Sequence, residues 1–121
     1  MSFSAEDRAL LDQVEEVEIE TQPPGGPAHR TTIWTVVDGD DVFVRSYRGD
    51  HARWYRDALA NPAVAIHANG HRIQATAIAA SDPQSIERAS AGYRRKYLGD
   101  PAAAAMVRAE VLSTTLRLEP A

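Results

Sequence analysis

Hydrophobic residues recur along this chain with two different spacings, which separate the predicted strands from the predicted helices. Between residues 14 and 22 they alternate with acidic residues, so that Val17 and Ile19 share one face, as in a half-exposed strand. Other stretches are rich in valine, isoleucine, threonine and aromatic residues, which favour strands. Together these patterns predict six strands, at residues 14–22, 29–37, 42–47, 63–68, 71–80 and 111–118.

Helices are predicted where a capping residue precedes hydrophobic residues spaced three or four positions apart. Ser4 and Asp7 form a capping-box pattern, and Asp50 and Asp82 each stand at a predicted N-cap. Within the third helix, the basic run at 94–96 lies away from the apolar stripe and is predicted to be a solvated face. The predicted helices run from 4 to about 13, from 50 to about 60, from 82 to about 97, and over a short alanine-rich segment after 99–101.

Two tight turns indicate the class of sheet. The sequence DGDD at 38–41 and the pair Asn69-Gly70 connect predicted strands through very short loops. The predicted order, α-β-β-β-α-β-β-α-α-β, lacks a regular strand–helix alternation and therefore favours an antiparallel sheet. A chain of 121 residues fits one domain, residues 1–121. We predict an α+β fold: a small six-stranded antiparallel barrel with inserted helices.

Two of the predicted strands, 29–37 and 42–47, are apolar or aromatic on both faces. One face would line the barrel interior, and the other needs a separate cover. Helices could supply that cover, and so could a second subunit. The pattern predicts a homodimer that uses the second face of these two strands.

Composition limits the partners of the chain. Its net charge of −4 at pH 7 argues against nucleic acid or an anionic membrane surface. It has no cysteine, which excludes disulfides and thiolate chemistry. The first residues, MSFSAEDRALLDQ, lack the apolar core of a signal peptide, and no segment has transmembrane length. We therefore expect a cytoplasmic protein that meets small molecules and a second copy of itself.

The four histidines do not form a metal-ligand pattern. With Asn69-Gly70 as the hairpin turn, Ala68 pairs with His71 and His67 pairs with Arg72. Adjacent strand residues point to opposite faces, so His67 and His71 point apart, and we predict no metal site. The sequence also lacks the Gly-x-Ser-x-Gly nucleophile motif and the glycine-rich motifs of nucleotide-binding loops.

The segment that follows residue 44 carries the strongest candidate for a binding site. Arg45 and Ser46 end a predicted strand, Arg48 follows, and Gly49 leads into a predicted helix N-terminus. Arginine side chains, a hydroxyl and free helix amides together suit a phosphate group. Asp50 argues against this interpretation, because its carboxylate would compete with an anion for the same amides.

The sequence from Thr31 to Val64 resembles the flavin-binding split-barrel families, which are the pyridoxamine-phosphate-oxidase-like proteins and the deazaflavin-dependent nitroreductases. The shared features are a strand ending in Trp or Tyr, a Val-Asp-Gly-Asp turn, a strand ending in Ser, and a helix that begins with Trp-Tyr. Here that helix reads Trp54-Tyr55 and then Leu59-Ala60-Asn61-Pro62, with one extra residue before the leucine. A related subfamily of unknown function shares the Ile-Trp and Val-Arg-Ser motifs found here at 33–34 and 44–46.

This resemblance implies a six-stranded split barrel, usually dimeric, that binds flavin mononucleotide (FMN) or a deazaflavin coenzyme in the cleft between subunits. The cofactor phosphate would lie against the strand end and the following helix, and the ring system nearer the preceding strand. Trp54, one turn into the helix, either lines the pocket or anchors the helix. The candidate cofactor-binding residues are Thr32, Trp34, Arg45, Ser46, Arg48, Gly49 and Trp54. Two departures from the families matter: Tyr47-Arg48-Gly49-Asp50 replaces a Gly-Gly after the serine, and the Ser-Arg-Lys of the oxidases is absent.

Two functions from different classes follow. The first is a flavin- or deazaflavin-dependent oxidoreductase acting on a small organic substrate, in which the cofactor performs the chemistry and the chain binds and orients it. The second is a non-enzymatic split barrel that binds a small ligand or a partner chain, which the carboxylate of Asp50 favours.

Overall fold

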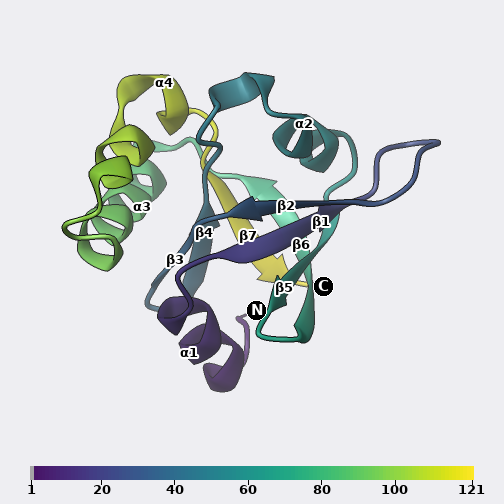
Figure 1. Ribbon diagram of the computed structural model, residues 1–121, viewed down its shortest axis with the longest axis horizontal. Coiled ribbons are helices and arrows are strands. Elements are labelled where there is room, and N and C mark those ends of the chain that lie inside the picture. Colours follow the sequence, from purple (N-terminus) through teal and green to yellow (C-terminus); the bar gives the residue numbers. More distant parts are fainter. Residues whose placement is uncertain (1) are drawn as a thin grey trace.

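The computed structural model describes residues 2–121, which form one antiparallel sheet of seven strands surrounded by helices (Figure 1). The strands are β1 (Val17–Thr21), β2 (His29–Ile33), β3 (Thr35–Asp38), β4 (Asp41–Val44), β5 (Ala63–Ala68), β6 (His71–Ala79) and β7 (Leu116–Pro120). The helices are α1 (Ala5–Gln13), α2 (Arg53–Ala60), α3 (Pro83–Lys96) and α4 (Ala109–Leu112), with two 3-10 helices, η1 (Gly49–His51) and η2 (Pro101–Val107).

The sheet curls because its two edge strands are consecutive in sequence. Neighbouring strands run in the order β2-β1-β5-β6-β7-β4-β3, so β2 and β3 lie at opposite edges although only Trp34 separates them. Ile33 pairs with Val17 of β1, whereas Thr35 pairs with Val44 of β4. The single strand predicted at 29–37 is therefore two strands, and the sheet has seven strands rather than six. The predicted α+β class and the antiparallel pairing are confirmed.

The inside of the curled sheet holds the larger apolar core. Strand side chains that alternate inward make up most of it, among them Val17, Ile19, Val42, Val44 and Ile66. The hairpin between β5 and β6 has the predicted register, with His67 opposite Arg72 and Ala68 opposite His71. Asn69 and Gly70 form its turn with φ values of 48° and 82°, a left-handed conformation that suits these two residue types.

A second, smaller core covers the outer face of β3 and β4. Val36 and Phe43 point outward there and are fully buried against α3 and η2, together with Tyr93 and Met106. Helices of the same chain therefore cover Val36 and Phe43, whereas Tyr47, at the end of the same predicted face, is 56% exposed. The predicted homodimer interface is wrong for Val36 and Phe43, which are not available to a second subunit, and the homodimer itself stays a prediction.

Two of the three predicted helix caps are confirmed. The Ser4 hydroxyl accepts a hydrogen bond from the Asp7 amide at 3.1 Å, and the Asp82 carboxylate accepts one from the Ser85 amide at 3.0 Å. The prediction for Asp50 is wrong, because Asp50 lies within η1 and α2 begins only at Arg53 with no side-chain cap.

The last predicted strand and the basic run on α3 also need correction. Val111 and Leu112 belong to α4, and residues 113–115 form a turn in which the hydroxyls of Thr114 and Thr115 donate to the carbonyls of Val111 and Leu112. The last strand, β7, begins only at Leu116. Lys96 is not solvated like its two neighbours: its ammonium donates to carbonyls at both α1 and β3. No helix within residues 2–121 combines the length and apolar character needed to cross a membrane.

Candidate functional site

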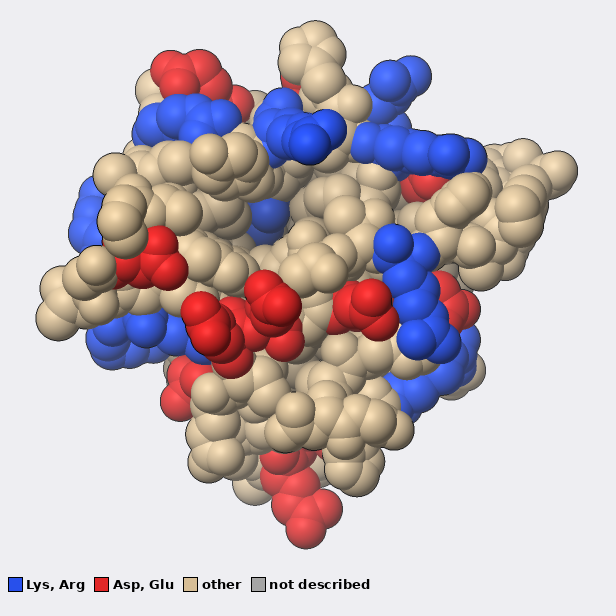
Figure 2. Space-filling view, viewed as in Figure 1, with Lys and Arg blue, Asp and Glu red and all other residues tan. Residues whose placement is uncertain are grey.

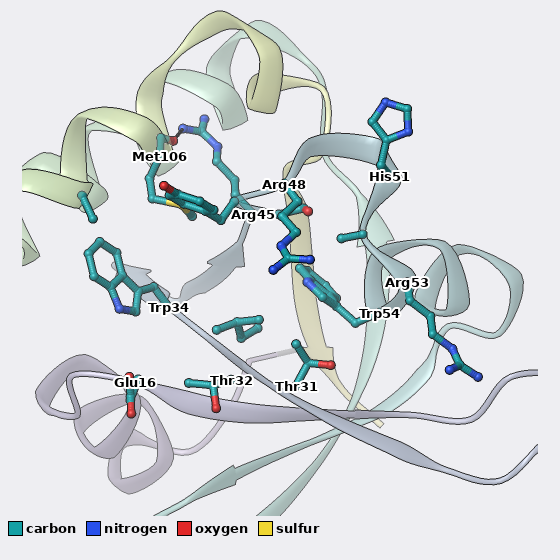
Figure 3. Close-up of a pocket in the computed structure, with 15 residues that line it drawn as sticks. Glu16, Thr31, Thr32, Trp34, Arg45, Arg48, His51, Arg53, Trp54 and Met106 are labelled. Atoms are coloured by element: carbon teal, nitrogen blue, oxygen red, sulfur yellow. Dashed lines mark hydrogen bonds between the residues drawn. The ribbon is translucent and has the colours of Figure 1, made fainter.

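A cavity of about 800 Å³ opens beside the bend between β2 and β3. Its wall is formed by residues 31–34 at the bend, residues 45–48 after β4, residues 51–54 at the start of α2, and side chains of η2 (Figure 3). This volume falls within the range of about 300–1,000 Å³ that is typical of small-molecule sites. Six of the seven predicted cofactor-binding residues border it: Thr32, Trp34, Arg45, Ser46, Arg48 and Trp54.

Gly49, the seventh predicted residue, does not border the cavity but forms the turn that positions its wall. It has a φ of 72°, a conformation that a side chain rarely adopts, and its amide donates to the carbonyl of Ser46 at 3.0 Å. The resulting turn directs the chain from β4 into η1. Gly49 therefore positions its neighbours and does not itself border the cavity.

Arg45 is buried in the wall, with 1% of its surface exposed. Its guanidinium donates to the hydroxyls of Thr115 and Ser90, each at 2.8 Å. It also donates to the carbonyls of Ile86 at 2.8 Å and Met106 at 3.0 Å. Four of the five guanidinium N–H groups are thus engaged by neutral oxygens. Arg45, which the sequence suggested as a phosphate ligand, thus joins the end of β4 to α3, to η2 and to the residue that precedes β7.

Arg48 is exposed and differs from Arg45 in every contact. Its side chain extends into the cavity toward Trp54, as Figure 3 shows. No hydrogen bond or ion pair within residues 2–121 involves its guanidinium. An unpaired guanidinium beside a cavity is suited to a carboxylate or phosphate, which it can bind through two parallel hydrogen bonds.

Ser46 lies between these two arginines and carries a hydroxyl that lacks a partner. Its backbone amide donates to the hydroxyl of Thr114 at 3.0 Å, which fixes the residue against the segment before β7. Its own Oγ is buried and makes no hydrogen bond. Buried hydroxyls are nearly always satisfied, so an orphaned one in a cavity wall suggests a missing polar partner.

The N-terminus of α2 also borders the cavity through Ala52, Arg53 and Trp54. No side chain caps its first turn, so no protein side chain offsets the positive end of the helix dipole at these amides. Asp50, which would compete for these amides, is instead exposed, with its carboxylate 3.5 Å from the imidazole of His51. Asp50 therefore does not cap α2 and does not occupy the amides that an anion would use.

Aromatic residues form two walls of the cavity. The Trp34 indole stacks on Tyr97 with ring centroids 3.8 Å apart and planes inclined by 6°. Trp54 is buried and meets Tyr55 edge to face, so it both lines the cavity and anchors α2 on the barrel. Rigid aromatic surfaces of this kind suit a planar ring system.

Charge divides the mouth of the cavity into two sides. In Figure 2 the hollow lies between basic side chains above it and acidic side chains below it. Arg48 and Arg53 border the cavity on the basic side, and Glu16 borders it on the acidic side. Glu16 and Met106 also border the cavity, although neither was a candidate from the sequence. The pairing of Val17 with Ile33, which places Glu16 next to Trp34, was the only available signal, and it requires the strand register to be known.

The histidines are engaged separately. His67 lies 2.7 Å from the carboxylate of Glu20, and hydrogen bonds from His67 and Arg72 lower the pKa of that carboxyl. His29 contacts the guanidinium of Arg53 at 2.8 Å. Within residues 2–121 no three histidine, aspartate or glutamate side chains are grouped as metal ligands would be.

Comparison with known protein families assigns the chain to one of them. The family described as "Uncharacterized protein conserved in bacteria (DUF2255)" matches residues 8–118. The chain belongs to this family. Among proteins of curated function, none matches the sequence.

Solved structures share the fold at low sequence identity. HutZ, the haem storage protein of Vibrio cholerae, is 16% identical with a TM-score of 0.71 over all of this chain and 92% of its own. A candidate pyridoxamine 5'-phosphate oxidase from Listeria innocua is 16% identical, with a TM-score of 0.67 over 95% and 90% of the two chains. An F420-H2 dependent reductase, FDR-A, is 20% identical with a TM-score of 0.67 over 91% and 97%. The protein thus has the split-barrel fold of the pyridoxamine-phosphate-oxidase-like proteins, as the sequence predicted.

Proposed function

We propose that this protein binds FMN or a deazaflavin coenzyme in the cavity and acts as an oxidoreductase on a small organic substrate. The observation that carries the proposal is the unpaired guanidinium of Arg48 beside the uncapped N-terminus of α2, at one side of a cavity with tryptophan walls. Three of the solved structures with this fold are described by names that refer to a flavin-type coenzyme, a pyridoxamine phosphate oxidase or haem storage. Their low identity supports the fold alone, so the cofactor is argued from the residues.

The residues at the basic side fit the phosphate of such a cofactor. Arg48 supplies a forked cationic donor, the first turn of α2 supplies amides, and Ser46 supplies a hydroxyl that lacks a partner. Arg45 does not join them as a direct ligand, since neutral oxygens already occupy four of its donors. It instead places an uncompensated positive charge behind the wall, which favours an anion in front of it.

The rest of the cavity fits a planar ring system. From the phosphate end, a cofactor would extend along Ile33 and Trp54 toward Thr32 and Trp34. These side chains exclude water from one face of the ring and hold its orientation. When bound, the cofactor supplies the hydride or electron transfer; the chain binds and shields it, which agrees with the lack of a nucleophile motif.

A homodimer that completes the cleft stays a prediction of the sequence. The face formed by Val36 and Phe43 is covered by α3, so a second copy would have to contact another surface. The mouth of the cavity, where Tyr47 and Arg48 are exposed, is the surface we propose for it. Light scattering at micromolar concentration, with and without cofactor, gives the assembly directly, and a species of only 13.2 kDa in both samples contradicts this proposal.

Titration of the purified protein with FMN, with a deazaflavin coenzyme and with haem, followed by absorption and fluorescence, tests the proposed function. We expect saturable binding of one of the first two, with reduction of the bound cofactor by a hydride donor. Binding of neither overturns the oxidoreductase proposal. The alternative, a barrel that carries another ligand, then takes its place.

A further inference from the structure

The acidic side of the cavity carries a carboxylate next to an aromatic surface. Val17 and Ile33 are the last pair of the β1–β2 ladder, so Glu16 and Trp34 follow them as neighbours on the two adjacent chains. Residues that occupy such opposite positions point to the same face of the sheet. Both Glu16 and Trp34 border the cavity, and Figure 3 draws them on the same side of it, away from Arg48.

One residue fixes both members of this pair. The ring of Tyr97 stacks on the Trp34 indole, and its hydroxyl donates to the backbone carbonyl of Glu15 at 2.6 Å. The indole and the chain that carries Glu16 are therefore held to the same buried anchor. The indole and this backbone are in place before a ligand arrives, so only the Glu16 side chain has to be ordered on binding, which limits the entropic cost.

The carboxylate of Glu16 is the acidic group that borders the cavity at this side. No hydrogen bond or ion pair within residues 2–121 involves the Glu16 side chain, whereas Glu18, the next residue on that face, lies 3.6 Å from Arg30. The pKa of Tyr97 is raised first by burial and further by the carboxylates of Glu15, Glu16 and Asp100. A free carboxylate beside a rigid indole is the arrangement that binds organic cations, through charge and through the face of the ring.

We propose that Glu16 and Trp34 form a subsite for a small organic cation, such as a protonated or quaternary amine. The assignment of this cation as the substrate of the oxidoreductase rests on the proposed function. The cofactor phosphate then lies on the side of Arg48, and the cationic group of the substrate lies at Glu16, so that each charge meets its opposite. An anionic substrate is disfavoured here, because Glu16 would repel it.

Binding of benzyltrimethylammonium to the cofactor-free protein tests this subsite. Benzoate and benzyl alcohol serve as the anionic and neutral counterparts, and calorimetry at low ionic strength measures all three. We expect the cation to bind most tightly. Glu16→Gln should weaken it about five-fold, as expected for an exposed charge pair, and Trp34→Leu should weaken it about ten-fold, through the loss of the ring face.

Glu18→Gln is the matched control, because Glu18 lies on the same face, contacts Arg30 and does not border the cavity. It should bind the cation as the parent does. Equal affinity for benzoate and the cation, or a Glu16→Gln variant that matches Glu18→Gln, overturns the inference. Thermal unfolding shows whether each variant is folded. If Trp34→Leu does not fold, the comparison of Glu16→Gln with Glu18→Gln alone tests the inference.

Titration of the same samples with FMN and with a deazaflavin coenzyme separates the two proposals. Binding of either cofactor without binding of the cation overturns the cation subsite and leaves the proposed function in place. Binding of the cation without either cofactor overturns the oxidoreductase proposal and supports the subsite alone.

Discussion

The wall behind the cavity and its rim are each built around an arginine, and the two arginines are only three residues apart. Arg45 continues the alternation of β4, so its side chain follows Phe43 to the outer face, where α3 and η2 cover it. Arg48 lies within the turn that the Gly49 amide closes on the carbonyl of Ser46, and its side chain extends into the cavity. Arg45 therefore holds four segments of the chain together, whereas the guanidinium of Arg48 has no partner within residues 2–121.

An arginine in a candidate phosphate site is therefore not by itself a ligand. A guanidinium with four neutral oxygen partners is held in place by the protein and supplies mainly charge. Burial lowers the pKa of Arg45, yet an arginine stays charged at any pH where the protein is folded. A guanidinium without partners is available to a ligand. Stability and binding should consequently separate when the two are replaced.

Replacement of Arg45 should cause the largest change in stability. Arg45→Ala leaves a cavity and deprives the buried carbonyl of Met106 and the hydroxyl of Ser90 of their donor. We expect the free energy of unfolding to fall by about 3 kcal/mol, the usual cost of removing a buried, fully engaged polar side chain. Urea denaturation followed by circular dichroism measures it. A fall of less than about 0.5 kcal/mol, the range typical of surface substitutions, would falsify the assignment of Arg45 as a structural residue.

Replacement of Arg48 should affect binding and leave stability unchanged. Arg48→Ala removes charge-assisted hydrogen bonds worth about 1.5–3 kcal/mol, so the affinity for the cofactor should fall by roughly ten- to a hundred-fold. Arg56→Ala is the matched control, because Arg56 is exposed on α2 and does not border the cavity. If Arg48→Ala and Arg56→Ala bind the cofactor equally well, the phosphate lies elsewhere.

Local rules predicted most of the elements from the sequence. The hairpin at Asn69-Gly70 and the caps at Ser4 and Asp82 depend on two to four neighbouring residues, and all three have the predicted geometry. The break at Trp34 depends on which strands lie at the two edges of the sheet, which is a property of the whole fold. A strand predictor that sees residues 29–37 alone has no reason to divide them.

The sequence predicted where the candidate site lies, but not the different roles of Arg45 and Arg48. The sequence selected the segment around Arg45 and Arg48, and six of the seven selected residues border one cavity. The burial of Arg45 depends on α3 and on η2, which are 41 to 61 residues further along the chain. The alternation of side chains along the predicted strand 42–47 indicated the same face for Phe43 and Arg45, but not that helices would cover it.

Lys96 offers a partly buried cation that, unlike Arg45, can lose its proton within an accessible pH range. Its ammonium donates to the carbonyls of Leu11 at 2.8 Å and Thr35 at 2.6 Å, and burial lowers its pKa to about 8. Between about pH 8 and its ordinary value of 10.5, the unfolded chain binds more protons than the folded chain. Stability should therefore rise over this interval, by about 1–2 kcal/mol after allowance for partial exposure.

Urea denaturation at pH 7.0, 8.5 and 9.5 measures the effect of Lys96. The readings should stop near pH 10, because the raised pKa of buried Tyr97 gives a contribution of opposite sign above that value. The parent should gain stability across the three values, and Lys96→Met should not. A parallel pH dependence in the two proteins would show that another group titrates.

The smallest and most diagnostic effect concerns Ser46, which lies between the two arginines. Its hydroxyl is buried without a partner, so Ser46→Ala removes a polar atom that the folded protein does not satisfy. We expect the free energy of unfolding to rise slightly, by at most about 1 kcal/mol. If that hydroxyl donates to a phosphate once the neighbouring side chains adjust, the same substitution should weaken cofactor binding by about five-fold. Opposite signs in stability and binding cannot arise from a general loss of structure. Unchanged cofactor affinity in Ser46→Ala would remove Ser46 from the phosphate site and leave Arg48 and the start of α2 to hold it.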